Sequence, residues 1–303
     1  MLSNFFQLNG TSFRNIQLQG DFETHLINAH GYLNAKYIPL ELKRESHHPH
    51  PKLRFKNKTF ENFSFSKTLI EDVEFYDCIF KDCHFIGVHI KNCLFQNCTF
   101  ESVNTFKIII ENTYLNPRSM VKSVAGIKNA NIGVHLFQQL LHNSEQMGQP
   151  TFAREAEFHF NKWENKLILA KFWIGLPSKI NWVTFLKSYP HRWVFQWMFG
   201  FGLRFRNFVL SFLFSFIVFW GVNYNNWEDY EMAPKDMTIS SFESDSTRIT
   251  SSAFYTLDVT TKLVDSQMQP KSNPGMVWLA IQSICAFMLM SALITLILNR
   301  FVK

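Results

Sequence analysis

Cysteine is scarce in this chain, and long apolar runs are absent from its first two hundred residues. Only five of the 303 residues are cysteine, whereas 47% are hydrophobic. A chain of this length and composition builds real hydrophobic cores, so we expect its stability not to depend on disulfides. The length has room for about two domains, and the contrast between a polar, asparagine-rich first half and an apolar end predicts two environments.

The sequence also lacks a recognisable export signal and catalytic motif. Its start, MLSNFFQLNG, has no basic region followed by a long apolar core and a small-residue cleavage site. We therefore expect the first half to stay in the cytosol, where structural disulfides are rare. No constellation of catalytic residues is recognisable, so the sequence predicts a protein that is not an enzyme and that needs no cofactor.

Four of the five cysteines lie in one stretch, FYDCIFKDCHFIGVHIKNCLFQNCTF, at residues 75–100. They are spaced C-x4-C, and zinc sites typically use C-x2-C, so we expect no metal here. His84 and His89 are expected to point to solvent. The stretch HHPHP at 47–51 is expected to be a loop, with a metal role as the less favoured alternative.

A five-residue period explains the cysteines. Large apolar residues recur every fifth position from Phe55 to Leu115, with a break at Thr105. Two residues before each lies a smaller or β-branched series, and the positions between are mostly polar. The predicted interior residues include Phe75, Phe80, Phe85, Ile90, Phe95 and Phe100 of the first series and Cys78, Cys83, Cys93 and Cys98 of the second. The period fits neither an amphipathic helix nor a strand, but it suits a solenoid.

These residues resemble the pentapeptide-repeat family over about residues 53–115. The resemblance implies a right-handed quadrilateral β-helix with four repeats per coil, and so about three coils in residues 53–116. We expect residues 1–52 to form an N-terminal segment, in which 11–36 would add an irregular extra coil through Phe13 and Leu18. In this arrangement the cysteines act as small buried hydrophobes.

Some soluble pentapeptide-repeat proteins imitate DNA and bind topoisomerases, which requires a strongly acidic surface. Residues 53–115 carry seven Lys and Arg against eight Asp and Glu. A nearly neutral surface gives that function little support.

Residues 117–172 predict a helical hairpin that turns at Gly148 and Pro150. Its second helix carries an apolar seam at spacings of three and four, namely Ala153, Ala156, Phe160, Trp163, Leu167 and Ala170. In part, the hairpin resembles the segment that follows pentapeptide repeats in ion-channel-like membrane proteins, at Gln139, Leu140, Gly148, Ala153, Ala156 and Phe158. The hairpin either simply packs, which we favour, or it assembles subunits or couples the solenoid to the membrane.

The middle of the chain is strongly basic. Residues 118–206 hold twelve Lys and Arg against four Asp and Glu, interleaved with tryptophans. Residues 173–206 are therefore predicted to be a basic interfacial linker at an anionic bilayer surface, with Arg192, Trp193, Arg204 and Arg206 as membrane-surface residues. Nucleic acid is the less favoured partner, because the segment runs directly into an apolar run.

Two uncharged runs, Asn207–Tyr224 and Met276–Leu298, meet the length needed to cross a bilayer. Arg204 and Arg206 precede the first and Arg300 and Lys303 follow the second, while the intervening 225–252 is acidic. By the positive-inside rule both termini are cytoplasmic and the acidic loop lies outside. We expect a multi-pass protein of the bacterial inner membrane.

Between these runs lies SSAFYTLDVTTKLVDSQMQP, which is half apolar and too short to span. A re-entrant pore helix and loop fits it. The stretch resembles the potassium-channel pore domain at Phe254, Tyr255, Val259, Thr260, Thr261 and Asp265. The resemblance implies a tetrameric two-span, all-α membrane domain over residues 207–303.

The filter departs from that family. Potassium filters use TVGYG carbonyl rings, and here Lys262, Leu263 and Val264 follow the threonines, so potassium selectivity does not carry over. The pore and filter candidates are Asp258, Thr260, Thr261, Lys262, Leu263, Val264 and Asp265. Asp258, Lys262 and Asp265 either form charged rings about a four-fold axis, or Asp258 and Lys262 pair locally at i, i+4. Both readings stay open.

The sequence thus predicts a multidomain chain in which a solenoid precedes a helical hairpin and a two-span domain. The favoured function is an ion-channel-like membrane protein whose cytosolic solenoid binds a partner or senses a signal. No nucleic-acid partner is expected. The expected partners are the lipid bilayer, further copies of the chain in a tetramer, and a cytosolic protein. The alternative is a non-conducting, membrane-anchored scaffold.

Overall fold

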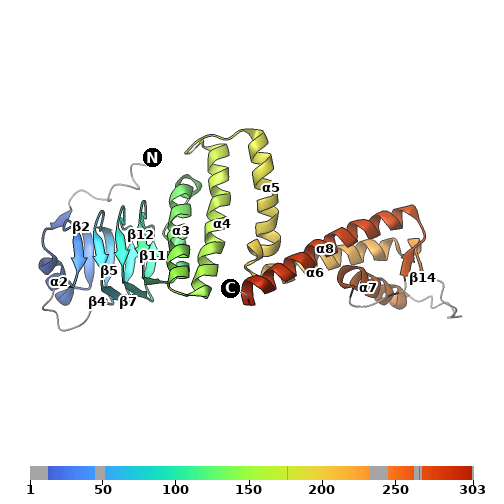
Figure 1. Ribbon diagram of the computed structural model, residues 1–303, viewed down its shortest axis with the longest axis horizontal. Helices are drawn as coiled ribbons and strands as arrows, with labels where there is room; N and C mark the ends of the chain where they lie inside the picture. Colours follow the sequence, from blue (N-terminus) through green and yellow to red (C-terminus); the bar gives the residue numbers. More distant parts are fainter. Residues whose placement is uncertain are drawn as a thin grey trace. The chain divides into compact units, whose positions relative to one another are not determined.

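The computed structural model describes residues 13–44, 52–175, 177–232, 245–262, 266 and 268–301. The chain divides into two compact units, residues 1–192 and 193–303, which are described separately (Figure 1). The histidine-rich stretch at 47–51 lies outside the described residues.

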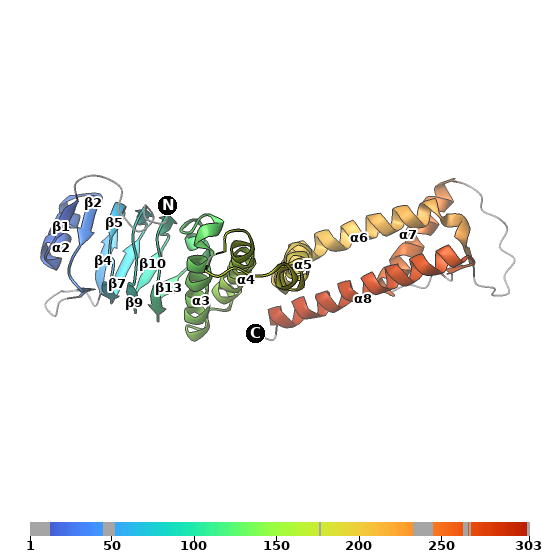
Figure 2. The ribbon, with the colours of Figure 1, turned by 90° about the horizontal axis from the view of Figure 1, so that it is seen from above.

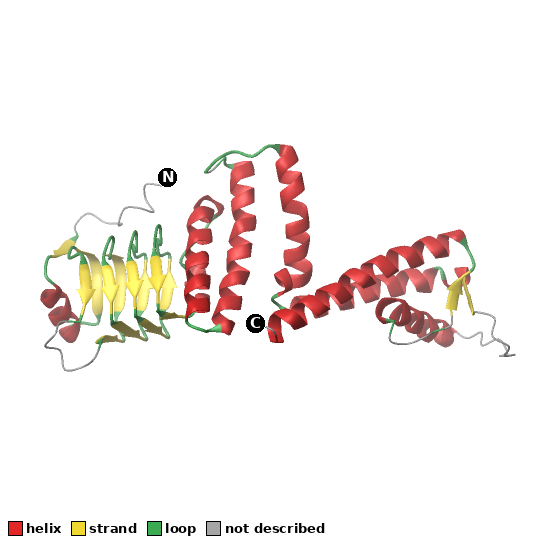
Figure 3. Cartoon of the chain, viewed as in Figure 1, coloured by secondary structure: helices red, strands yellow, loops and turns green. Residues whose placement is uncertain are grey.

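The first unit begins with a β-solenoid. Its strands are β1 (Arg14–Ile16), β2 (Gly31–Tyr37), β3 (Glu41–Lys43), β4 (Leu53–Lys56), β5 (Thr59–Ser64), β6 (Leu69–Glu71), β7 (Val73–Tyr76), β8 (Ile79–Lys81), β9 (His89–Lys91), β10 (Leu94–Gln96), β11 (Thr99–Glu101), β12 (Ile109–Glu111) and β13 (Tyr114–Leu115). They form three parallel sheets, in the orders β1-β2-β5-β8-β11, β13-β10-β7-β4 and β12-β9-β6-β3. The strands stack along one axis (Figure 3).

Each coil of the repeat region takes twenty residues. Phe55 pairs with Phe75, and Phe75 pairs with Phe95. A fourth face is held by the bridges from Ser64 to His84 and from His84 to Asn104. Four five-residue repeats therefore make one turn of the solenoid, and one repeat contributes to each face.

The solenoid interior contains both predicted series. Phe75, Phe80, Phe85, Ile90, Phe95 and Phe100 are at most 2% exposed, and Cys78, Cys83, Cys93 and Cys98 are at most 6% exposed. The phenylalanine rings stack from coil to coil, with centroids 5.0 Å apart for Phe60 and Phe80 and 4.9 Å apart for Phe80 and Phe100. The cysteine thiols are free and donate to backbone carbonyls of the preceding coil, as Cys83 does to Phe60 at 3.2 Å.

The corners of the coils repeat with the same period. The second residue after each interior position of the main series, Thr105 included, has φ between 45° and 64°, at Asn57, Asn62, Lys67, Asp72, Asp77, Asp82, Gly87, Asn92, Asn97, Ser102, Lys107 and Asn112. Asn and Asp enter this left-handed region more readily than most residues. They therefore turn the chain once per repeat.

Two expectations for the solenoid are wrong. Leu18 is 65% exposed, and the N-terminal coils, which extend the solenoid ahead of residue 53, bury other residues, among them Ile16, Tyr32 and Leu42. His84 is only 8% exposed, because its backbone forms the bridges of the fourth face and its side chain is enclosed there.

Helix α2 (Gln19–Asn28) closes the N-terminal end of the solenoid (Figure 2). Its Phe22 is fully buried, with its ring centroid 5.2 Å from Tyr32, 5.2 Å from Tyr37 and 5.5 Å from Phe55. The aromatic ladder thus ends on a helix side chain, so solvent does not reach the first coil from that end.

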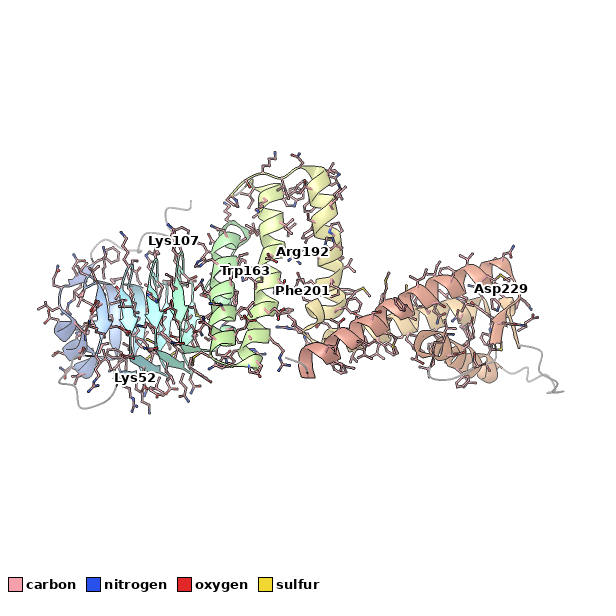
Figure 4. All side chains as sticks on the ribbon, in the orientation of Figure 1. Lys52, Lys107, Trp163, Arg192, Phe201 and Asp229 are labelled. Carbon is pink, nitrogen blue, oxygen red and sulfur yellow. The ribbon has the colours of Figure 1, made fainter. Side chains whose placement is uncertain are left out.

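A helical hairpin covers the other end. It follows η1 (Pro117–Lys122) and η2 (Ile127–Asn129) and consists of α3 (Ala130–Gln146) and α4 (Pro150–Trp173). The hairpin shares one hydrophobic core with the solenoid. Gly133 lets the helices approach closely, because a Cβ there would lie 2.3 Å from the ring of Trp163, which Figure 4 labels.

The second unit is built on two long apolar helices. After α5 (Trp182–Phe199), which leads into it, come η3 (Gly200–Gly202), α6 (Phe205–Asn225), η4 (Trp227–Asp229), β14 (Tyr230–Met232), α7 (Asp245–Thr261), β15 (Met268–Pro270) and α8 (Asn273–Phe301). Strands β14 and β15 pair antiparallel. Helix α7 packs against both α6 and α8.

Candidate membrane-embedded site

Helices α6 and α8 are long and apolar enough to cross a membrane, over Phe205–Asn225 and Asn273–Leu298. Only 11% of the apolar window in α6 and 28% of that in α8 is buried inside the protein. Large apolar side chains such as Phe214, Ile284 and Phe287 are more than half exposed. A helix in the core of a soluble protein would bury such residues, so this exposure favours a lipid environment.

Helix α7 lies between α6 and α8 in sequence and has one buried face. Ser252, Tyr255, Thr256, Val259 and Thr260 are at most 3% exposed. On the opposite side Phe254 is 47% exposed. The buried face of α7 is therefore rich in hydroxyl groups, whereas most amphipathic helices bury an apolar face.

Asn223 of α6 forms hydrogen bonds at this buried face of α7. Its Nδ2 donates to Thr256 Oγ1 at 2.8 Å and to Gln282 Oε1 at 3.1 Å. Its Oδ1 accepts from the hydroxyl of Tyr230 at 3.0 Å. Asn223 is 1% exposed, so all of these bonds form away from solvent.

Gln282 of α8 completes this arrangement, which we call the polar node: Asn223, Tyr230, Thr256, Thr260 and Gln282. Gln282 Nε2 donates to the backbone oxygen of Thr256 and to Thr260 Oγ1, each at 3.2 Å. Thr256 in turn donates to the backbone oxygen of Ser252 at 2.7 Å. The node ties α6, α7 and α8 together. Interhelical hydrogen bonds of this kind contribute on average about 0.6 kcal/mol each in a membrane protein.

The carboxylate of Asp258 holds the chain just after α7. Its Oδ2 accepts from the backbone N–H of Ser266 at 3.1 Å and from the Ser266 hydroxyl at 2.6 Å. The other oxygen lies 3.9 Å from Nζ of Lys262. Asp258 thus contacts both Ser266 and Lys262 within one chain.

Lys262 ends α7 in a left-handed conformation with φ of 55°. Its N–H donates to the backbone oxygen of Asp258 at 2.7 Å, and its side chain is 69% exposed. Glycine is the usual residue at such a helix end. Lys262 therefore accepts some backbone strain while presenting its ammonium group outward.

The remaining pore candidates divide into two groups. Thr260 belongs to the polar node, and Thr261 Oγ1 donates to the backbone oxygen of Leu257 at 2.8 Å. Leu263, Val264 and Asp265 lie outside the described residues. Within the described part of the chain, no group of three or more His, Cys, Asp or Glu side chains could hold a metal ion.

The predicted membrane-surface residues have different surroundings. Arg192 pairs with Glu164 of α4, Nη2 to Oε2 at 2.6 Å, and its Nε donates to Asn165 Oδ1 at 2.9 Å. Trp193 is 51% exposed. Arg204 precedes the first turn of α6, and Arg206 is exposed. Arg192 is therefore engaged within the protein.

Asn223 and Gln282 were missed by reasoning from sequence. Both are uncharged amides, and the two apolar runs were judged by their lack of charge. Polar residues inside a membrane-spanning helix are costly unless they are paired. The presence of an amide in each run was therefore the sequence feature that could have predicted a contact between them.

The family model described as the SV2A/B/C luminal domain matches residues 51–125. The matched region holds the regular coils of the solenoid and η1, and it is well under half of the chain, so the similarity concerns this region alone. No curated protein sequence matches this chain.

Proposed function

We propose that the protein is an ion-channel-like membrane protein in which α6 and α8 cross the bilayer and α7 is a re-entrant pore helix. The observation that carries this proposal is the polar node, which joins a short helix with a hydroxyl-rich face to two lipid-compatible helices. An isolated pair of anchoring helices has no need of such a node. The solenoid, which resembles pentapeptide repeats, would bind a partner or sense a signal.

Oligomerisation is part of the proposal. A single pair of spans encloses no pore, and a four-fold arrangement would gather four copies of the α7 end around one axis. Lys262 is exposed in the single chain, which fits a position on such an axis. Four ammonium groups there would oppose cation passage unless Asp258 compensates for them, so we expect weak cation selectivity or tolerance of anions.

A second function, a non-conducting membrane scaffold, is favoured by a different observation. Asp258 is used by Ser266 and Lys262 within one chain, and the residues after α7 lack the glycines of a potassium filter. In that case the spans anchor the solenoid, and α7 is a structural element of the anchor.

Ion flux into liposomes that contain the purified full-length protein separates the two functions. For a channel we expect flux that Lys262→Ala shifts toward cations and that Asp258→Ala shifts toward anions. Lys271→Ala, which removes an exposed lysine outside α7, is the matched control and should leave selectivity unchanged. Absence of flux in every version, across voltages and ions, would leave the scaffold.

A further inference from the structure

Helix α5 carries a stripe of exposed apolar residues. Two of them also touch a neighbouring ring, Trp182 that of Phe172 in α4 and Trp197 that of Phe214 in α6. Trp182, Leu186, Trp193 and Trp197 are 59%, 50%, 51% and 61% exposed. Their spacings of four, seven and four place them within about 60° of one another around a helix that turns about 100° per residue. Val183 and Val194, 62% and 42% exposed, widen this stripe along one side.

A different side of α5 is already occupied. The ring of Phe185 stacks on Phe172 of α4, with centroids 4.2 Å apart. About two turns further on, Arg192 pairs with Glu164 and Asn165, and Figure 4 labels Arg192 on this helix. These contacts fix the rotation of α5 about its axis, so the apolar stripe is held outward.

The third side of α5 is polar in the first part of the helix, up to His191, whereas Phe195, 41% exposed, lies on that side further along. Thr184, Lys187 and His191 are exposed, and they lie about 100° or more from the centre of the stripe by helical geometry. A helix with tryptophans on one exposed side and a basic polar side beside it is typical of helices that lie in the plane of a membrane interface. Tryptophan prefers the headgroup level, where its ring is buried and its N–H stays hydrated.

Charge identifies the kind of bilayer. Residues 118–206 hold twelve Lys and Arg against four Asp and Glu, so this part of the chain is attracted to an anionic surface. A soluble protein partner would have to match both three tryptophans and this positive charge, whereas an anionic bilayer satisfies both at once.

We propose that α5 lies in the plane of an anionic membrane surface, with Trp182, Leu186, Trp193 and Trp197 inserted at the headgroup–acyl boundary. The helix then supplies a membrane contact separate from the two spans. Arg192 positions this helix on α4 and does not bind lipid itself. The inference rests on one part of the proposed function, namely that α6 and α8 cross a bilayer and so bring α5 to its surface.

The test uses full-length protein with Cys285→Ala, since the other four cysteines are buried. Leu186→Cys on the stripe and Thr184→Cys on the polar side are each labelled with an environment-sensitive fluorophore. The proteins are placed in nanodiscs of phosphatidylcholine with or without phosphatidylglycerol. We expect a blue shift and quenching by spin-labelled lipid at position 186 but not at 184, both stronger with phosphatidylglycerol.

A label in α8, at Phe287→Cys, reports span insertion independently, because that residue is 74% exposed. Quenching at 287 with equal or no quenching at 186 and 184 would overturn the inference and leave the spans intact. A blue shift at 186 that lipid does not quench and that persists in detergent would assign the stripe to a protein partner, which also overturns it. No quenching at 287 would contradict both the inference and the membrane-spanning function.

Discussion

The two series of interior positions in the solenoid accommodate side chains of different size. Phe80 is fully buried between Phe60 and Phe100, with ring centroids 5.0 Å and 4.9 Å away. Cys83 occupies the neighbouring series, where its thiol donates to the backbone oxygens of Phe60 and Lys81. The ladder position fits an aromatic ring, whereas the second position fits a small side chain.

We predict that Phe80→Ala lowers the free energy of unfolding of the solenoid by about 3–5 kcal/mol, because it removes a ring and leaves a cavity between two others. Phe80→Leu keeps most of the volume and should cost less, so it remains measurable if the alanine variant does not fold. Hydrogen exchange of solenoid amides in the full-length protein reports the change. A cost for Cys83→Ala as large as that for Phe80→Ala would contradict this account.

The buried thiols predict a loss of stability at high pH. Burial raises the pKa of Cys83 and of Cys93 from 9.0 to about 12. Each buried thiol contributes fully to the free energy of unfolding below the pKa that it has in the unfolded chain. This contribution is lost as the pH rises toward the pKa of the folded state, because in that window only the unfolded chain ionises. At pH 10 the loss is about 1 kcal/mol per thiol.

Unfolding of the solenoid measured by hydrogen exchange at pH 8 and pH 10 tests this prediction. The double variant Cys83→Ala and Cys93→Ala has the same lysines and tyrosines, so it controls for their titration. Equal pH dependence in the two proteins would show that these thiols ionise readily in the folded solenoid.

The ends of the solenoid are closed by helices, and they show how one element completes another. Asn143 of α3 is fully buried. Its Oδ1 accepts from the N–H of Thr113 at 2.9 Å, and its Nδ2 donates to the oxygen of Thr113 at 2.7 Å. The side-chain amide thus takes the place that a peptide group of another coil would occupy. It provides hydrogen-bond partners for the backbone N–H and C=O of Thr113 in the last coil.

We predict that Asn143→Leu destabilises the last coil by about 1–3 kcal/mol for each backbone group of Thr113 that it leaves unpaired. The effect should appear as faster hydrogen exchange in residues 93–115, with the earlier coils less affected. Gln138→Leu, an exposed position on the same helix, is the control. Unchanged exchange at Thr113 would mean that water or another group replaces the amide.

Regular elements were predictable where one chemical period governs many residues. The interior phenylalanines and cysteines followed from the five-residue period, and α6 and α8 from their apolar runs. Helix α2 was not predicted, because a single buried Phe22 closes the end without a repeat. The bonds of Asn223 with Gln282 could not be predicted either, because they join residues 59 positions apart and nothing local to either residue specifies the other.

At the scale of the whole molecule, charge is distributed unevenly along the chain. The residues before the first span are basic, and the segment between the spans is acidic at Glu228, Asp229 and Glu231. Lys and Arg are retained on the cytoplasmic side of a membrane more often than on the other side. From this asymmetry we predict a cytoplasmic solenoid, whereas the name of the family similar to residues 51–125 describes a luminal domain.

Thiol labelling of intact cells decides between these orientations. In a Cys285→Ala background, Glu228→Cys and Lys107→Cys each place one exposed thiol, the first between the spans and the second on the solenoid. We predict that a membrane-impermeant reagent labels position 228 in intact cells and position 107 only after permeabilisation, because the basic flanks of both spans stay inside. The reverse pattern would place the solenoid outside the cytoplasm and would make the charge distribution a poor guide to topology here. Labelling of both positions in intact cells would mean that the two helices do not cross the membrane as a pair.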